Sequence, residues 1–170
     1  MNSLSRYIIH FGGLKEGVYN YDFEIDNRFF EAFEYKEFNF SKIKTLVSLE
    51  KKFNLINIKF YLSGIINIDC DVSNEPFDMT IKEEFKIMVK FAKEYNDIDD
   101  EIIFLPHGSH KIDISQYIYE MLILSIPLKK THPGIKKGTL DSYVLKKLKE
   151  YQPRNLKKTD PRWDKLKDLL

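Results

Sequence analysis

The sequence predicts an α+β domain: a mainly antiparallel, curved β-sheet, then a buried helix, then basic helices at the C-terminus. Three observations support this. Two long segments rich in β-branched and aromatic residues, 55–69 and 79–91, are joined by turn residues, as in a β-hairpin. An apolar helix is expected over residues 114–125. Basic residues gather after residue 128.

Further strands are expected on both sides of this hairpin. Residues 19–26 alternate apolar and polar side chains, which is the period of a half-buried strand. Residues 45–50 and 102–105 are shorter strand candidates. Between the first two, residues 27–35 carry closely spaced phenylalanines, which suits a bend or a short helical turn.

The hairpin carries two expectations of its own. Gly64 lies inside its first strand, where a glycine usually marks a bulge or a close approach of two backbones. Cys70 lies at the turn end of that strand. A helix is the competing interpretation for residues 79–91, because Lys and Glu are abundant there.

The apolar helix is bounded by recognisable signals. Asp113 can cap it at its start and Pro127 ends it. Its apolar residues cover more than one face, which indicates a buried helix. Glu120 lies inside this apolar stretch, so it either needs a buried partner or marks the solvent edge of the helix.

Two helices are expected nearer the C-terminus, after a loop. Thr139 can cap a basic amphipathic helix over residues 140–151. Asp160 is followed by a proline at the first helical position, a pattern typical of a helix start. This last helix would carry Trp163 on its apolar side.

Charge divides the chain into two parts that cancel in its net charge of +1. Residues 1–128, the expected acidic β-rich core, hold 14 basic and 21 acidic residues. Residues 129–170, an expected helical extension packed on that core, hold 13 basic and 5 acidic residues. Such asymmetry points to a nucleic acid or another polyanion, with a solvated lysine-rich tail as the alternative. The candidate RNA-binding residues are Lys129, Lys130, Lys136, Lys137, Arg154, Lys157, Lys158 and Arg162.

Motifs for catalysis or cofactor binding are scarce. The single cysteine excludes an internal disulfide and a Cys-rich zinc site. His107 and His110 precede Asp113, but a metal or general-base site needs three or more converging groups. We therefore expect no metal, no cofactor and no enzymatic activity. We see no export or membrane-spanning segment, and expect a cytoplasmic protein that does not bind membranes.

Three passages together resemble the bacterial YceD family. They are residues 64–77 (GIINIDCDVSNEPF), residues 112–134 (IDISQYIYEMLILSIPLKKTHPG) and the C-terminal DPRWDKLKDLL. The middle passage is the most specific, with an aspartate-led helix, an inner glutamate, a Ser-Ile-Pro stop and a following histidine. The positions that match the family pattern are Cys70, Asp113, Glu120, Pro127, His132 and Trp163.

The chain departs from that pattern at one place. Many members have a second cysteine three positions after the one matching Cys70, and often another after the histidine. This chain has Ser73 at the first of these positions and no later cysteine. If those cysteines form a metal knuckle elsewhere in the family, it cannot form here, and the hairpin must be held by packing alone.

The resemblance implies a non-enzymatic role in the synthesis, processing or stability of large-subunit (23S) ribosomal RNA. The implied partner is this RNA or its precursor, and the acidic sheet could dock a basic ribosomal protein. One alternative is a protein-only adaptor that binds the ribosomal protein and touches no RNA. A second is a metal-dependent hydrolase that uses His107, His110 and Asp113.

Overall fold

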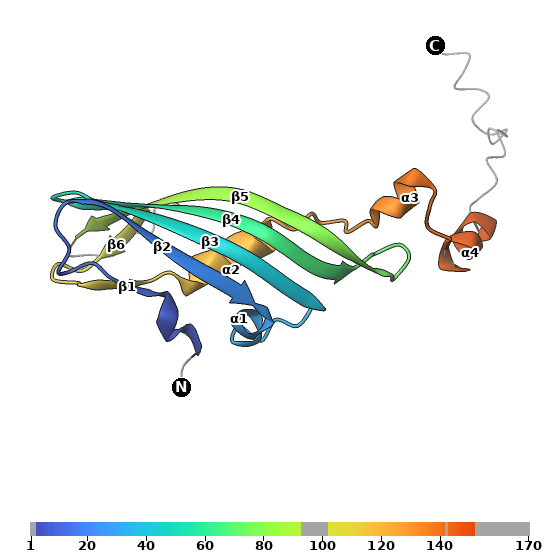
Figure 1. Cartoon of the computed structure of the whole chain (residues 1–170), viewed down its shortest axis with the longest axis horizontal. Coiled ribbons are helices and arrows are strands. Elements are labelled where there is room, and N and C mark those ends of the chain that lie inside the picture. The colour runs from blue at the N-terminus through green and yellow to red at the C-terminus, as the bar shows by residue number, and fades with distance from the viewer. Residues whose placement is uncertain (1–2, 93–101, 142, 152–170) are drawn as a thin grey trace, which may run out of the picture. The chain divides into compact units, whose positions relative to one another are not determined.

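The structure is a computed structural model that describes residues 3–92, 102–141 and 143–151 (Figure 1). The chain divides into two compact units, Met1–His132 and Pro133–Leu170, and each is described by itself. The first unit contains all the described strands, and the fold is α+β with a mainly antiparallel sheet, as predicted.

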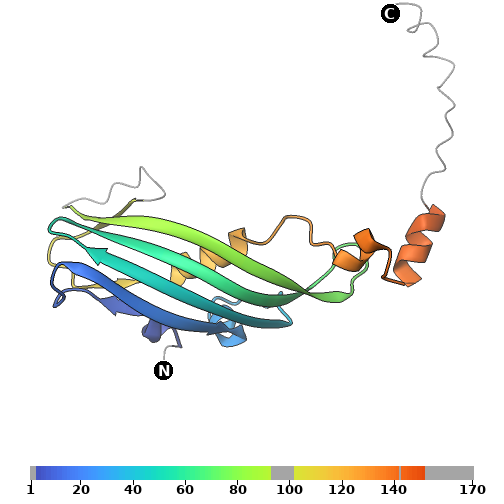
Figure 2. The ribbon, with the colours of Figure 1, turned by 45° about the horizontal axis from the view of Figure 1, so that its top comes forward.

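The main sheet has five strands that follow one another in chain order. All neighbours are antiparallel except the last pair, which is parallel. The sheet is open, and its long central strands run side by side (Figure 2). The strong curvature expected from the sequence is not confirmed. The strands are β2 (Gly17–Asp26), β3 (Phe40–Lys51), β4 (Leu55–Asp69), β5 (Pro76–Phe91) and β6 (Ile102–Leu105).

The hairpin of β4 and β5 is confirmed, and the helical alternative for residues 79–91 is wrong. The two strands pair without interruption from Leu55 opposite Lys90 to Asp69 opposite Pro76. Successive side chains point to opposite faces of the sheet, so the buried residues fall at alternate positions. On β4 the buried side chains are Ile56, Ile58, Phe60, Leu62, Ile66 and Ile68.

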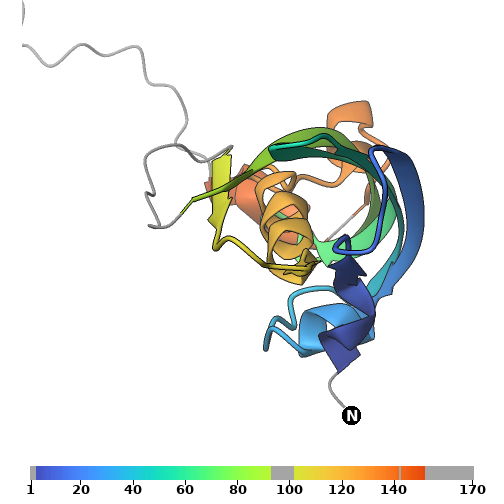
Figure 3. The ribbon, with the colours of Figure 1, turned by 90° about the vertical axis from the view of Figure 1, so that its left-hand side faces the viewer.

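One helix, α2 (Ser115–Leu124), lies against the buried face of this sheet (Figure 3). Its inner side buries Ile118, Met121 and Leu122. Its other side is open to solvent, since Leu124 is 83% exposed. The expectation of a helix buried on more than one face is therefore wrong, because the sheet covers only one side of it.

Two differences from the predicted strands have local causes. Strand β3 begins at Phe40, five residues earlier than predicted, because polar Ser41 and Thr45 occupy buried positions and obscure the apolar alternation. The Ser41 hydroxyl donates to Asn27 Oδ1 at 2.7 Å, which satisfies its hydrogen-bonding need. The short helical turn expected after β2 is confirmed as α1 (Asn27–Glu31).

A small second sheet was not predicted. Strands β1 (Ile8–His10) and β7 (Lys111–Asp113) pair antiparallel, preceded by the 3-10 helix η1 (Ser3–Tyr7). Each strand has only three residues, and the two lie about 100 residues apart in the chain. Such short segments lack a local pattern, so only their tertiary pairing makes them strands.

The second unit contains two described helices. The first, α3 (Pro133–Lys137), occupies a stretch expected to be a loop. The second, α4 (Tyr143–Tyr151), begins four residues after Thr139, which is therefore not its N-cap. The predicted terminal helix with Asp160 and Trp163 lies outside the described residues. In the described part of the chain, no helix is long and apolar enough to cross a membrane.

The expected close approach at Gly64 gives a stability prediction. A Cβ atom at Gly64 would lie 2.5 Å from the Cα of Ile43 and against the carbonyl oxygen of Lys42, both on the neighbouring strand. Gly64→Ala should therefore lower the free energy of unfolding by about 1–3 kcal/mol, because the two backbones must separate. Chemical denaturation measures this change.

Gly13→Ala is the matched control, since a Cβ at Gly13 meets nothing within 4 Å. We expect its free energy of unfolding to be unchanged, or raised by up to about 1 kcal/mol. A Gly64→Ala protein as stable as the Gly13→Ala protein would contradict the close approach.

Candidate functional site

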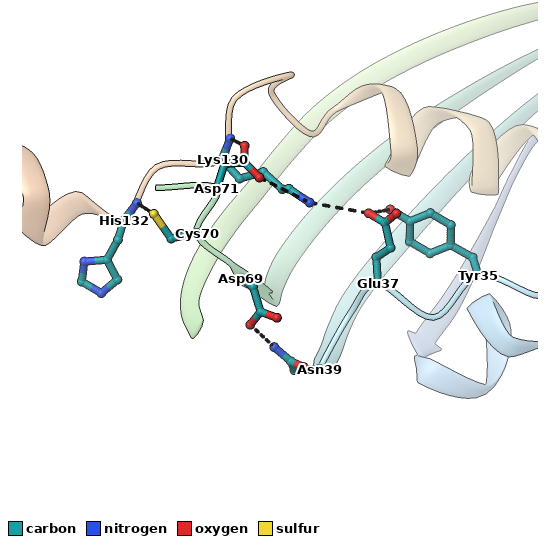
Figure 4. A network of polar contacts seen from close by, with 8 residues as sticks. All are labelled: Tyr35, Glu37, Asn39, Asp69, Cys70, Asp71, Lys130 and His132. Carbon is teal, nitrogen blue, oxygen red and sulfur yellow. Dashed lines mark hydrogen bonds and ion pairs between the residues drawn. The ribbon is translucent and has the colours of Figure 1, made fainter. Parts of the chain in front are cut away.

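Cys70 and His132, two of the residues that match the family pattern, meet where the β4–β5 turn touches the segment after α2 (Figure 4). The turn is closed by two backbone hydrogen bonds, from Asn74 N to Cys70 O at 2.8 Å and from Cys70 N to Glu75 O at 3.0 Å. Asn74 adopts a left-handed conformation, with φ of 56°, which asparagine tolerates better than most residues. The turn therefore presents residues 70–73 in a fixed geometry.

Asp71 and Lys130 form a reciprocal pair of hydrogen bonds that joins the turn to this segment. Asp71 N donates to Lys130 O at 2.9 Å, and Lys130 N donates to Asp71 Oδ2 at 2.6 Å. A carboxylate that accepts a backbone N–H makes a stronger bond than a neutral acceptor does. We call this contact the Asp71–Lys130 clamp.

Cys70 adds a second connection beside the clamp. Its side chain is buried, and its sulfur accepts a hydrogen bond from His132 N at 3.2 Å. The His132 ring lies edge-on to Phe77, with centroids 5.5 Å apart. Cys70 and His132 thus come together through the histidine backbone and not through its ring.

The surroundings of Cys70 act on its pKa in opposite directions. Burial raises the pKa of the thiol, whereas the Ser73 hydroxyl and the backbone N–H groups of His132, Ser73 and Val72 lower it. The balance holds the pKa of Cys70 below its ordinary value, because these donors favour the thiolate. Ser73, three positions after Cys70, is itself buried.

The side chain of Lys130 forms ion pairs with two carboxylates of the protein. Its ammonium lies 3.5 Å from Glu37 Oε2 and 4.0 Å from Asp71 Oδ1, and the side chain is 25% exposed. Glu37 also accepts from the Tyr35 hydroxyl at 3.2 Å. Burial, with the nearby Glu37 carboxylate, raises the pKa of Tyr35 to about 12. Lys130, proposed from the sequence to bind RNA, therefore has a structural partner.

Neither Glu37 nor Asp71 was singled out from the sequence. Asp71 follows the family cysteine directly, and this position is the only signal that could have pointed to it. Glu37 carries no such signal, because its contact with Lys130 joins residues 93 positions apart in the chain.

The other residues matched to the family have simpler roles. Asp113 Oδ1 accepts from Ser115 N at 2.9 Å and from Ser115 Oγ at 2.6 Å, so its carboxylate binds the first residue of α2. The N-cap position is Ile114, one residue later than expected. Glu120 is exposed and accepts from Gln116 Nε2 at 2.8 Å, which places it at the solvent edge of the helix. Trp163 lies outside the described residues.

The histidines expected from the hydrolase alternative do not form a site. His107 and His110 are exposed, and the Asp113 carboxylate is already bound by Ser115. Over residues 3–92, 102–141 and 143–151, no group of three or more His, Cys, Asp or Glu residues could hold a metal ion.

The remaining basic candidates divide between the two units. Lys129 is exposed at the end of the first unit, and Lys136 and Lys137 are exposed in the last turn of α3. Helix α4 adds the exposed Lys146, Lys147 and Lys149, of which Lys146 pairs with Asp141 at 2.8 Å. Four candidates lie outside the described residues, namely Arg154, Lys157, Lys158 and Arg162.

The clamp gives a stability prediction. Asp71→Ala should lower the free energy of unfolding by about 1–3 kcal/mol, because Lys130 N loses a charged acceptor. Asp22→Ala is the control: Asp22 is exposed on β2, and its removal should change stability by less than about 0.5 kcal/mol. Equal free energies of unfolding of the two variants in urea denaturation would show that the clamp does not stabilise the protein.

Comparison with known proteins places these residues in a family. No curated protein and no solved structure matches the chain. Residues 58–170 match a family model described as large ribosomal RNA subunit accumulation protein YceD. The match covers well over half of the chain and includes Cys70, the Asp71–Lys130 clamp and α2. The chain belongs to the YceD family.

Proposed function

We propose that this protein is a non-enzymatic cytoplasmic factor that supports the synthesis, processing or stability of large-subunit ribosomal RNA by binding that RNA or its precursor. Family membership links the chain to the accumulation of this RNA. The observation that carries the binding proposal is the exposure of lysines between residues 129 and 151. They belong to residues 129–170, which hold 13 basic and 5 acidic residues.

Phosphate contacts by such lysines supply most of the affinity of a protein for nucleic acid and make it sensitive to salt. No base-reading motif accompanies these lysines. The proposed binding therefore recognises the shape and the backbone of the RNA more than its sequence.

A protein-only adaptor is the second candidate, and one cavity favours it. A cavity of about 560 Å³ lies between β5 and α2. Its lining residues include the acidic Glu83 and Glu120 and the apolar Phe85, Met121 and Leu124. Acidic and apolar groups together suit a basic segment of a ribosomal protein.

Sedimentation of a cell lysate tests the RNA proposal. The protein should co-sediment with precursors of the large ribosomal subunit, and less so as salt rises from about 50 to 200 mM. The triple variant Lys157→Gln/Lys158→Gln/Arg162→Gln should co-sediment less. The triple variant Lys15→Gln/Lys36→Gln/Lys111→Gln removes as many charges from exposed lysines elsewhere, and should sediment like the wild type.

Two results separate the candidates. Unchanged sedimentation of the first triple variant would remove the basic C-terminal residues from the proposal. A complex with a ribosomal protein that survives nuclease treatment would favour the adaptor, since the RNA-dependent complex should dissociate.

A further inference from the structure

The face of the main sheet opposite α2 carries an unusual set of exposed side chains. In the first unit, none of the described helices covers this face (Figures 1 and 3). The alternation that buries Val47 and Phe60 turns the neighbouring side chains outward. On β3, β4 and β5 the outward residues include Lys42, Lys44, Lys59, Tyr61, Lys82 and Lys86, all exposed. We call this set the lysine–tyrosine face.

The strand register places Tyr61 at the centre of this face. Tyr61 is opposite Leu46 on β3 and opposite Glu84 on β5. In the next row on one side Ser63 is opposite both Lys44 and Lys82, and in the next row on the other side Lys59 is opposite Lys86. Neighbouring strands lie about 4.8 Å apart and rows about 6.8 Å apart, so the four lysines border the tyrosine ring.

Lys42 and Lys44 are directly opposite the carboxylates of Asp26 and Glu24 on β2. Lys59, Lys82 and Lys86 have no carboxylate directly opposite them on a neighbouring strand. None of the five forms an ion pair with a carboxylate among the described residues. Lys59 and Lys86 are directly opposite on neighbouring strands, an arrangement of like charges that destabilises a sheet. A bound polyanion would remove that repulsion.

The charges on this side of the sheet are unevenly placed. In the row of Tyr61 and the two rows beside it, the outward positions of β3 to β5 carry four lysines and one carboxylate, that of Glu84. The acidic outward residues Asp22, Glu24 and Asp26 gather on the edge strand β2. A positive strip around an exposed aromatic ring is thus present within the acidic part of the chain.

From this arrangement we propose that the lysine–tyrosine face binds a single-stranded segment of RNA. One base stacks on the ring of Tyr61, which is 36% exposed, while the surrounding lysines contact the phosphates. The proposal rests on the proposed function only in taking RNA as the partner. It adds a binding surface on the sheet that is separate from the basic residues after position 128.

An RNA partner explains the face better than an acidic protein does. Lysines alone would suit either polyanion, but an exposed tyrosine ring among four lysines also offers a flat surface on which a base can stack, and a run of acidic side chains has no group that stacks. Sequence preference is not expected, because every base has a face that can stack.

Fluorescence anisotropy with the full chain and a labelled single-stranded oligouridine of about 12 nucleotides tests this proposal. Tyr61→Ala should weaken binding by about 5- to 100-fold, whereas Tyr61→Phe should bind within about twofold of the wild type because it keeps the ring. Lys44→Gln/Lys59→Gln/Lys82→Gln/Lys86→Gln should weaken binding and lower the slope of log affinity against log salt by about 2 to 3.

Thermal unfolding shows whether each variant is folded. The quadruple variant should unfold at the same temperature as the wild type or higher, because it removes the repulsion between Lys59 and Lys86. Lys15→Gln/Lys36→Gln/Lys111→Gln controls for charge lost elsewhere and should bind like the wild type.

Several results would overturn the proposal. They are failure of the wild type to bind the oligouridine, binding by folded Tyr61→Ala equal to that of Tyr61→Phe, or a salt slope unchanged in the quadruple variant. Competition by poly-glutamate as effective as that by unlabelled oligouridine would assign the face to an acidic protein instead. The proposed function fails separately, if the wild type does not co-sediment with subunit precursors.

Discussion

The register of β3, β4 and β5 determines where the other features of the first unit lie. A slip of one residue would turn every buried side chain of a strand outward and every lysine inward. With Phe60 opposite Val47 and Phe85, the apolar side chains form one face that α2 can cover. The same register brings Gly64 against the β3 backbone, where no larger residue fits. It also produces the lysine–tyrosine face.

The Asp71–Lys130 clamp connects the sheet to the segment that follows α2. It holds the segment after α2 against the end of the hairpin, so the helix is attached at its C-terminal side as well as through its buried face. The clamp also occupies Lys130 with Asp71 and Glu37. The lysines that we propose to bind RNA therefore lie elsewhere, on the sheet, at Lys129 and after Lys130.

The sequence predicted what depends on local pattern. Residues 55–69 match β4 at both ends, because β-branched and aromatic residues alternate there and turn residues follow. The pairing of β1 with β7 and the contact of Glu37 with Lys130 could not be predicted, since each joins segments far apart in the chain. The sequence contains the lysines around Tyr61, but it does not show that they lie close together. Their proximity depends on the register of three strands. The breadth of the apolar surface on α2 suggested full burial, yet only one face is covered.

Photo-crosslinking with mass spectrometry tests most directly whether this protein binds RNA through its sheet as well as its basic C-terminal part. Wild-type protein bound to a ribosomal RNA transcript is irradiated, digested with trypsin and searched for peptides that carry a nucleotide. We expect one crosslinked peptide to contain Tyr61 and others to come from residues 129–170. A complex that still forms but gives no crosslink in the Tyr61 peptide, or none in residues 129–170, would contradict this account.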